Sequence, residues 1–368
     1  VAFLVGFVHQ FTINMVSMTL ATNWPAILGK LLRKDELERA EADWAMTQIM
    51  AGDASAAQVG AFMLALRSKG ETPTELAGLV DVMLRNAVIL DTGNDAVDIV
   101  GTGGDMVGTV NISSMAAILT SAAGVPVMKH GSRSASGKTG SSEMLEVLGI
   151  RLDLSPERVS DVFREVGITF FFAPVFHPAM RYVAPIRREL GIPTTFNFLG
   201  PLANPAQPIA TSLGVADASV APLMAAEMAA RGRSALVFRG SDGLDELTTT
   251  GISRIWQVSG GEVDESEFKP ASLGISKASL EQLIGGDPQH NAHVAKSLFE
   301  NPSAGPISDI VKLNAAAGLV AYELAKDSSK VSADLDSRFA DAYQKVTVTL
   351  ESGAAAEKLS QWMAATQA

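Results

Sequence analysis

Glycines, an acid and a run of amide and hydroxyl side chains follow one another in VGTGGDMVGTVNISS, Val100–Ser114. Glycines let backbone N–H groups approach an anion closely, and the start of a following helix adds partial positive charge. Asn111, Ser113 and Ser114 offer further donors, and the Ser113 hydroxyl could also reach a metal ion. The stretch is not a dinucleotide-binding fingerprint, because that motif needs a glycine where Met106 stands. Phosphate binding and a plain glycine-rich turn are both compatible with the spacing.

Basic and hydroxyl side chains alternate in a second stretch, KHGSRSASGKTGSSE, residues 129–143. It does not match a P-loop, because the first glycine of that motif would have to stand at Ser132. Cations interleaved with hydroxyls suit a polyanion that has several phosphate oxygens. The alternative is a solvated surface loop. The concentration of basic residues in a chain of formal net charge −11 makes that alternative less favoured. The side chains concerned are Lys129, Arg133, Lys138, Ser132, Ser134, Ser136 and Ser141.

Two adjacent acids, Asp245 and Glu246, lie in the stretch GSDGLDELTTTG, residues 240–251, directly after a strand-like run. Carboxylates with hydroxyl groups nearby suit Mg²⁺, an ion that keeps several waters and bridges to substrate phosphates. The alternative is the first turn of a helix, where the helix dipole favours acids. Spacing alone leaves both interpretations open.

Arg187 and Arg188 lie in a helical pattern within residues 177–205. An arginine that faces a cavity can hold a carboxylate through two parallel hydrogen bonds. The alternative is a surface pair that answers Glu189. His290 and His293 lack a third metal ligand nearby, so we interpret them as surface residues. The absence of cysteine excludes disulfides, thiolate metal sites and a cysteine nucleophile.

The elements that must position these residues change character near Asp95. Up to about Val88, apolar residues recur at helical spacing, and Thr72, Pro73 and Glu75 form a capping-box helix start. Beyond it, short β-rich runs alternate with helical patterns, which predicts a largely parallel sheet with helices on its faces. The β-rich runs are AVDIV, VPVMKH, ITFFFAP, TSLGVA, SALVFRG and RIWQVSG.

We therefore predict an α/β protein: a small N-terminal helical domain plus a larger α/β domain with a central, mostly parallel sheet. The helical domain covers residues 18–90, with a returning helical segment near 182–205, and the α/β domain covers 91–368. We interpret residues 1–17 as an extension upstream of the native start. A genuine apolar helix is the alternative there.

The acidic balance, with a pI of about 5.0, argues against broad binding of nucleic acids or anionic membranes. The apolar start of the chain has no basic residue before it, as a secretory signal would, and it is too short to span a bilayer. We expect a cytoplasmic protein.

These four stretches in this order resemble the anthranilate phosphoribosyltransferases, and the similarity runs over nearly the whole chain from about Met18. It rests on GTGGD, NISS, KHG with an arginine two residues on, RREL, FNFLGPLANP and DGLDE. Single stretches are shared with nucleoside phosphorylases of the same fold, whereas the ordered set is specific. The resemblance implies a nucleoside phosphorylase/phosphoribosyltransferase fold with its active site between the two domains.

The resemblance further implies a step of tryptophan biosynthesis. The phosphoribosyl group of phosphoribosyl pyrophosphate (PRPP) passes to the amine of anthranilate, giving N-(5-phosphoribosyl)anthranilate and pyrophosphate. The family uses Mg²⁺ and is usually a homodimer that associates through the helical domain. Attack at the ribose carbon passes through a cationic state, so catalysis is mainly positioning and charge neutralisation. We expect no covalent enzyme intermediate.

The resemblance assigns three groups of residues by motif. Anthranilate would contact Gly101, His130, Ser132 and Arg187. The metal would contact Ser113, Asp245 and Glu246, and Lys129, Asp245 and Glu246 would stabilise the transition state. PRPP would contact Gly101, Gly104, Asp105, Thr109, Asn111, Ile112, Ser113, Ser114, Lys129, His130, Gly131, Ser132, Arg133, Ser134, Ala135, Ser136, Gly137 and Ser141.

Ser132 departs from the family pattern, which has an asparagine after KHG that contacts anthranilate and the ribosyl substrate. Serine is a shorter donor, and a bridging water would have to close the gap. We therefore expect Ser132 to bear on anthranilate affinity more than on phosphate binding.

Two other functions are weighed against the transferase. Arg187 and the NFLGPLANP block speak against a nucleoside phosphorylase of the same fold. The net charge of −11 and the Asp245–Glu246 pair speak against a silent homologue that binds nucleic acid.

Overall fold

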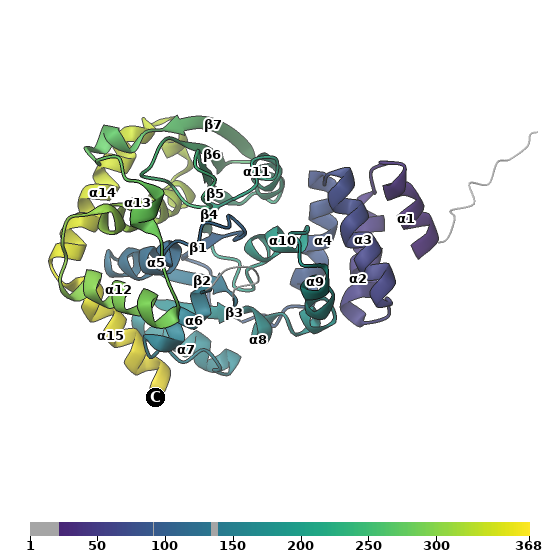
Figure 1. Ribbon diagram of the computed structural model, residues 1–368, viewed down its shortest axis with the longest axis horizontal. Coiled ribbons are helices and arrows are strands. Elements are labelled where there is room, and N and C mark those ends of the chain that lie inside the picture. Colours follow the sequence, from purple (N-terminus) through teal and green to yellow (C-terminus); the bar gives the residue numbers. More distant parts are fainter. Residues whose placement is uncertain (1–21, 91, 134–138) are drawn as a thin grey trace, which may run out of the picture.

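The computed structural model describes residues 22–90, 92–133 and 139–368, and Figure 1 shows two lobes side by side. Residues 1–17, interpreted above as an upstream extension, lie outside the described residues. The same holds for five residues of the basic loop: Ser134, Ala135, Ser136, Gly137 and Lys138. No helix within the described residues is long and apolar enough to cross a membrane.

Four helices form the bundle of the smaller lobe (Figure 1). The side chains of Asn23, Ser55 and Thr72 each accept a backbone N–H of the first helical turn that follows, which satisfies a donor the helix itself leaves unpaired. The capping box of Thr72 and Glu75 expected from the sequence is present. The helices are α1 (Trp24–Leu32), α2 (Arg39–Ala51), α3 (Ala56–Lys69) and α4 (Pro73–Arg85).

Seven strands form one sheet in the larger lobe, in the order β3-β2-β1-β4-β5-β6-β7. The first five in that order run parallel, and β6 and β7 extend the sheet as an antiparallel hairpin. The mostly parallel sheet predicted from the sequence is confirmed. The strands are β1 (Val97–Gly101), β2 (Val127–Gly131), β3 (Ile168–Phe172), β4 (Ala210–Gly214), β5 (Ser234–Gly240), β6 (Ser253–Ser259) and β7 (Glu262–Phe268).

Strand β7 is the one strand that the sequence analysis did not predict. Its sequence EVDESEF is rich in acids, and its side chains are largely exposed because it lies at the edge of the sheet. Charges on an edge strand hinder pairing with other chains. The pair Gly260 and Gly261, both with positive φ, was the available signal for a tight hairpin turn after β6.

Helices cover both faces of the sheet. On one face, α5 and α13 contact each other and the central strands, and on the other, α10 and α11 lie between the sheet and α4. The remaining helices are α5 (Ile112–Ala122), α6 (Ser141–Val147), α7 (Pro156–Val166), α8 (Ala173–Phe176), α9 (Ala184–Leu190), α10 (Phe196–Leu202), α11 (Ala221–Ala230), α12 (Pro288–Glu300), α13 (Pro306–Lys326), α14 (Leu335–Glu351) and α15 (Ala354–Gln367).

The apolar core on the second face of the sheet continues into the helical lobe. Val237 and Trp256 of the sheet belong to the same buried cluster as Phe62 and Leu79 of the bundle. Helix α9 packs against α3, so a later part of the chain also lies on the bundle. The two lobes are therefore packed together, while the boundaries predicted at residues 18–90 and 91–368 stay predictions.

The order of the strands reverses its direction between β1 and β4. Open parallel sheets bind ligands beyond the carboxyl ends of the strands at such a point. Gly101 and Gly214 end these strands and lie opposite each other. A Cβ on Gly214 would lie 1.6 Å from the carbonyl oxygen of Asp245, and one on Gly101 would lie 2.2 Å from Oδ2 of Asp245. Both glycines are needed because Asp245 rests directly on the strand ends.

Candidate active site

Asp245 and Glu246 each accept a backbone N–H from the glycine-rich stretch. Oδ2 of Asp245 accepts the N–H of Gly103 at 2.7 Å, and Oε1 of Glu246 accepts the N–H of Ser113 at 3.0 Å. Ser113 lies in the first turn of α5, whose N-terminus favours a negative charge. The two acids and the glycine-rich stretch, predicted separately from the sequence, therefore meet in one place.

Like charges crowd this place. Burial, followed by the neighbouring Asp105 carboxylate, raises the pKa of Asp245 to about 7. Burial and Asp245 raise the pKa of Glu246 well above its usual range, and burial also raises that of Asp105. A cation beside these carboxylates would relieve the repulsion, so the donor set fits a divalent ion.

The protein supplies only part of the coordination shell of such an ion. Within the described residues, no group of three or more histidine, aspartate or glutamate side chains is arranged to hold a metal by itself. Mg²⁺ commonly takes one or two carboxylates and completes its shell with waters and substrate phosphates. The acidic pair fits that pattern.

Lys129 is a buried residue of β2. Its ammonium donates to the carbonyl oxygen of Ile99 and lies 3.4 Å from Oγ of Ser113. Burial lowers the pKa of Lys129, whereas the charges of Asp98 and Glu246 raise it. The charges of nearby carboxylates thus act on this cation, and its predicted contact with phosphate oxygens stays a prediction.

A distant segment holds the glycine-rich stretch in shape. Asn291, a buried residue of α12, donates to Oδ1 of Asn111 at 2.9 Å and accepts the N–H of Gly286 at 2.8 Å. The N–H of Gly285 donates to the carbonyl oxygen of Gly108 at 2.9 Å. Sequence reasoning missed Asn291, because only the fold brings it beside Asn111.

Helix α10, which carries the block FNFLGPL, orients His130. Nδ1 of His130 lies 3.0 Å from the carbonyl oxygen of Gly200, and Nε2 is buried without a hydrogen-bond partner. A carbonyl can only accept, so Nδ1 carries the proton and Nε2 has a free lone pair. Burial, followed by the neighbouring His177, lowers the pKa of His130 to about 3, so the ring is neutral near pH 7.

Asn204, two residues after α10, supports the strand that bears His130. Its amide donates to Oδ2 of Asp98 and to the carbonyl oxygen of Met128, both at 2.8 Å. Oδ1 of Asp98 accepts the N–H of His130 at 3.1 Å. The block FNFLGPLANP therefore braces the ends of β1 and β2 from one side of the sheet.

Arg187 also contacts α10. Its guanidinium is half-buried and lies 3.4 Å from Oδ1 of Asn197. In the described part of the chain no carboxylate forms an ion pair with Arg187, so the surface pair with Glu189 considered above is absent. Its neighbour Arg188 is exposed. A half-buried guanidinium without a countercharge suits a carboxylate ligand.

The other predicted residues take different positions around this centre. Ile112 and Ser114 are buried, so a ligand could meet only their main chain. Arg133 pairs with Glu146 at 2.9 Å and lies over the ring of Phe172. The exposed Ser132 presents its carbonyl oxygen to Oγ of Ser141 at 3.3 Å. Gly101, Gly104, Asp105, Thr109, Asn111 and Gly131 are all partly accessible.

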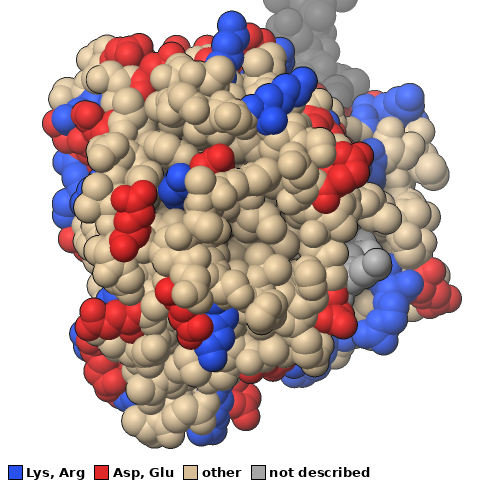
Figure 2. Space-filling model, turned by 60° about the vertical axis from the view of Figure 1, so that its left-hand side comes forward, with Lys and Arg blue, Asp and Glu red and all other residues tan. Residues whose placement is uncertain are grey.

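Charged side chains of both signs are interspersed on the face shown in Figure 2, with no broad basic patch among the residues coloured there. His290 and His293 are exposed, in agreement with their interpretation as surface residues.

Two family models match the chain. The glycosyl transferase family a/b domain matches residues 93–356, and the glycosyl transferase family helical bundle domain matches residues 25–87. An anthranilate phosphoribosyltransferase of Leifsonia xyli subsp. xyli is 50% identical over 350 residues, which cover 95% of this chain and 100% of the relative. That of Arthrobacter sp. is 50% identical over 344 residues, 94% of this chain and 96% of the relative.

Solved structures of anthranilate phosphoribosyltransferases are also similar to this chain. The anthranilate phosphoribosyltransferase of Thermus thermophilus is 38% identical with a TM-score of 0.84, covering 93% of this chain and 99% of that one. The enzyme of Saccharomyces cerevisiae in complex with PRPP and Mg is 26% identical with a TM-score of 0.83, covering 94% of this chain and 98% of that one.

The neutral histidines make stability depend on pH. Burial lowers the pKa of His177 from 6.5 to about 4. Between these values the unfolded chain binds a proton at His177 and the folded chain does not. In this pH range, His177 therefore lowers the unfolding free energy of the parent by about 1.4 kcal/mol for each unit by which the pH falls. We expect the stability advantage of the parent over His177→Gln to shrink as the pH falls from about 7 to 5. Urea unfolding measures it, and an advantage that stays constant or grows would contradict the assignment.

Proposed function

This chain belongs to the anthranilate phosphoribosyltransferases, and we propose that the site just described binds PRPP and anthranilate and joins them. The enzyme transfers the phosphoribosyl group to the amine of anthranilate and releases pyrophosphate. The observation that carries the anthranilate assignment is the half-buried Arg187, which has no carboxylate partner in the described chain and so suits the carboxylate of anthranilate.

The pyrophosphate end of PRPP would lie against the glycine-rich stretch. The N–H groups of Thr102, Gly103 and Ser113 are already used within the protein. Those of Gly104 and Asp105, and that of Ser114 at the start of α5, would supply donors for its oxygens. Asn111 is held in place by Asn291, so the cradle is ordered before a ligand arrives. The predicted contacts of Lys129, of residues 131–137 and of Ser141 complete the proposal.

Asp245 and Glu246, with the Ser113 hydroxyl, would hold Mg²⁺. When bound, the ion neutralises the negative charge that develops on the departing pyrophosphate. Burial and neighbouring negative charge raise the pKa of both carboxyls, and a cation would stabilise their charged forms in that environment. The relative from Saccharomyces cerevisiae is in complex with PRPP and Mg, which supports the proposal.

Anthranilate would lie between Arg187 and His130. The guanidinium of Arg187 takes the carboxylate, and the neutral His130 would line the same pocket. Gly101 would line the same pocket, and Ser132 stands where a bridging water has to replace the family's asparagine. A neutral His130 adds no positive charge beside the developing cation.

The bond from the ribose carbon to pyrophosphate breaks as the bond to the amine nitrogen forms, and the nitrogen then gives up one proton to water or to the released pyrophosphate. We propose that no covalent enzyme intermediate forms and that the described residues act by positioning and by charge. Trapping a ribosyl adduct of the protein would overturn this.

We expect Arg187→Ala to raise the KM for anthranilate about ten- to hundred-fold, because a charge-assisted contact is lost. The KM for PRPP stays close to that of the parent. The loss of anthranilate fluorescence with PRPP and Mg²⁺ measures both constants, and the exposed neighbour in Arg188→Ala is the matched control. Equal effects of the two variants would contradict the role of Arg187. A parent without turnover would overturn the proposed function.

Asp245→Asn tests the acidic pair. The pKa of Asp245 is raised, so its ionisation above about pH 7 destabilises the folded chain without a cation. We expect the substitution to stabilise the metal-free protein at about pH 8, and to lower kcat about hundred-fold or more. Asparagine keeps an oxygen for the N–H of Gly103. Lower thermal stability of the metal-free variant, or turnover equal to the parent, would contradict the assignment.

We also propose that two copies associate through the helical lobe. Leu32 on α1 and Leu64 on α3 are 78% and 41% exposed, and these two helices pack side by side. Exposed apolar groups gathered on one part of a lobe favour an interface. We expect sedimentation equilibrium to give a dimer that Leu64→Glu weakens. A monomeric parent would contradict the proposal.

A further inference from the structure

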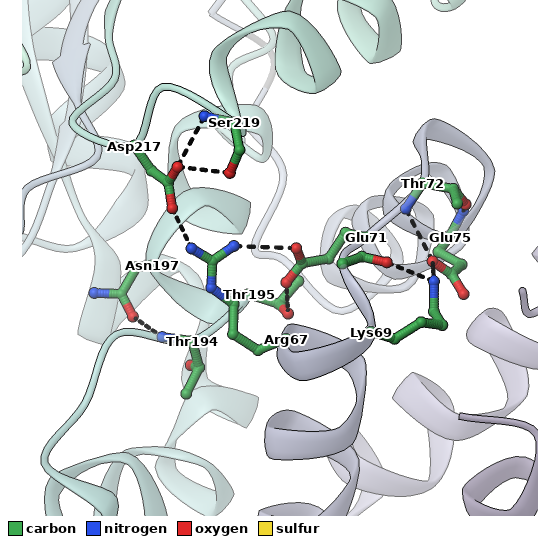
Figure 3. A network of polar contacts seen from close by, with 11 residues as sticks. Arg67, Lys69, Glu71, Thr72, Glu75, Thr194, Thr195, Asn197, Asp217 and Ser219 are labelled. Atoms are coloured by element: carbon green, nitrogen blue, oxygen red, sulfur yellow. Dashed lines mark hydrogen bonds and ion pairs between the residues drawn. The ribbon is translucent and has the colours of Figure 1, made fainter. Parts of the chain in front are cut away.

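Arg67, on the last turn of α3, reaches from the helical lobe to the α/β lobe (Figure 3). Its Nη1 lies 3.2 Å from Oε2 of Glu71, and its Nη2 donates to Oδ2 of Asp217, which follows β4. The guanidinium also lies 5.8 Å from the ring centre of Phe198 on α10. One side chain therefore touches the bundle, the loop after β4 and α10.

The contact with Asp217 leads to the phosphate-binding stretch. The N–H of Ala216, next to Asp217, donates to Oγ1 of Thr102 at 3.1 Å, and the N–H of Thr102 donates to the carbonyl oxygen of Gly214 at 3.0 Å. Thr102 stands between Gly101 and Gly103. A displacement of Asp217 would thus shift Thr102 and the glycine-rich stretch that is proposed to bind the pyrophosphate.

The contact with Glu71 leads to the anthranilate side. Oε1 of Glu71, a buried carboxylate, accepts the hydroxyl of Thr195 at 2.5 Å, directly before α10 (Figure 3). Asn197 on this helix accepts the N–H of Thr194 at 3.0 Å and the guanidinium of Arg187 at 3.4 Å. The position of Arg187 thus depends on the anchorage of α10.

Arg67 also lines a cavity that lies between its two branches of contacts, the one through Asp217 and the one through Glu71. This cavity, of about 150 Å³, is lined by Arg67, by Gly103 and Gly104 of the phosphate stretch, and by Asn197 and Asp217. The turn after α3 is itself anchored, because the buried ammonium of Lys69 pairs with Glu75 at 2.9 Å. The planar fork of arginine can serve two carboxylates at fixed angles, which lysine cannot.

We propose that Arg67 is a positioning residue of the transferase, and that it sets the spacing between the phosphate-binding stretch and the arginine that holds anthranilate. The inference rests on the proposed function, because it concerns the two substrates of that reaction. The amine must meet the ribose carbon at attack distance, and small displacements of either substrate slow such a reaction strongly.

The two branches can be tested separately. Thr195→Val keeps the shape of the side chain and removes only the bond to Glu71, so the KM for anthranilate rises while the KM for PRPP stays. Asp217→Asn weakens the other branch, so the KM for PRPP rises while the KM for anthranilate stays. Arg67→Met affects both branches, and we expect each KM to rise and kcat/KM to fall about ten-fold. Arg67→Lys restores the function only in part.

Arg85→Met is the matched control, because Arg85 of α4 pairs with Asp43 of α2 at 2.7 Å and so makes its ion pair within the bundle. We expect it to leave both KM values unchanged. A second readout is coupling: the rise in anthranilate KM caused by Arg67→Met is smaller in an Arg187→Ala background, because both substitutions act through α10. Thermal melting shows which variants are folded.

Distinct outcomes separate the two claims. Should the parent turn over PRPP and anthranilate while Arg67→Met behaves like Arg85→Met, the inference is overturned and the proposed function stands. The inference is also overturned if Thr195→Val and Asp217→Asn each change both KM values equally, because that result shows a general loss of packing. This test does not depend on which of the Arg67 variants folds. A parent without PRPP-dependent turnover overturns the proposed function and the inference together.

Discussion

The rest of the structure depends on the contact between the buried Asp245–Glu246 pair and the ends of the central parallel strands. The main chain of Asp245 rests on Gly214, and its carboxylate lies against Gly101 and the N–H of Gly103. Burial raises the pKa values of Asp245, Glu246 and Asp105, and the charges of neighbouring carboxylates raise them further, so a cation beside these groups would be stabilising. Such a site destabilises the fold locally and is relieved when a cation and its phosphate arrive. Glycines at both strand ends and the start of α5 follow from the same requirement.

Helix α10 connects this charged centre to the second substrate. Over seven residues it offers the carbonyl that fixes the tautomer of His130, the amide that contacts Arg187, and the ring on which Arg67 lies. It also lies within an apolar core that the bundle and the sheet share. The geometry of the site therefore depends on the placement of the helical lobe. A change in the packing of α3 or α4 would be transmitted to the pocket through few intermediates.

Much of this could be predicted from the sequence, because it is encoded locally. The parallel strands appear as β-branched and apolar runs since both their faces are buried, and Thr72 and Glu75 mark the start of α4 by their own hydrogen bonds. The rest depends on distance along the chain. Asn291 supports Asn111 from 180 residues away, and Arg67 reaches Asp217 across 150. Spacing could not distinguish Arg187 from Arg188, because only packing against α10 makes one of them half-buried. Strand β7 was not predicted, because its acidic residues suit an exposed edge and its sequence has no apolar alternation.

The central claim is that the acidic pair and the phosphate-binding stretch form one site, which is complete only with a cation. The most direct measurement is calorimetric titration of inorganic pyrophosphate into the purified protein, with and without Mg²⁺, at about pH 7.5. The account predicts binding that is at least about hundred-fold weaker without Mg²⁺, because two or three buried carboxylates then face the anion unscreened. Pyrophosphate affinity that is the same with and without Mg²⁺ would contradict it and separate the phosphate site from the acids.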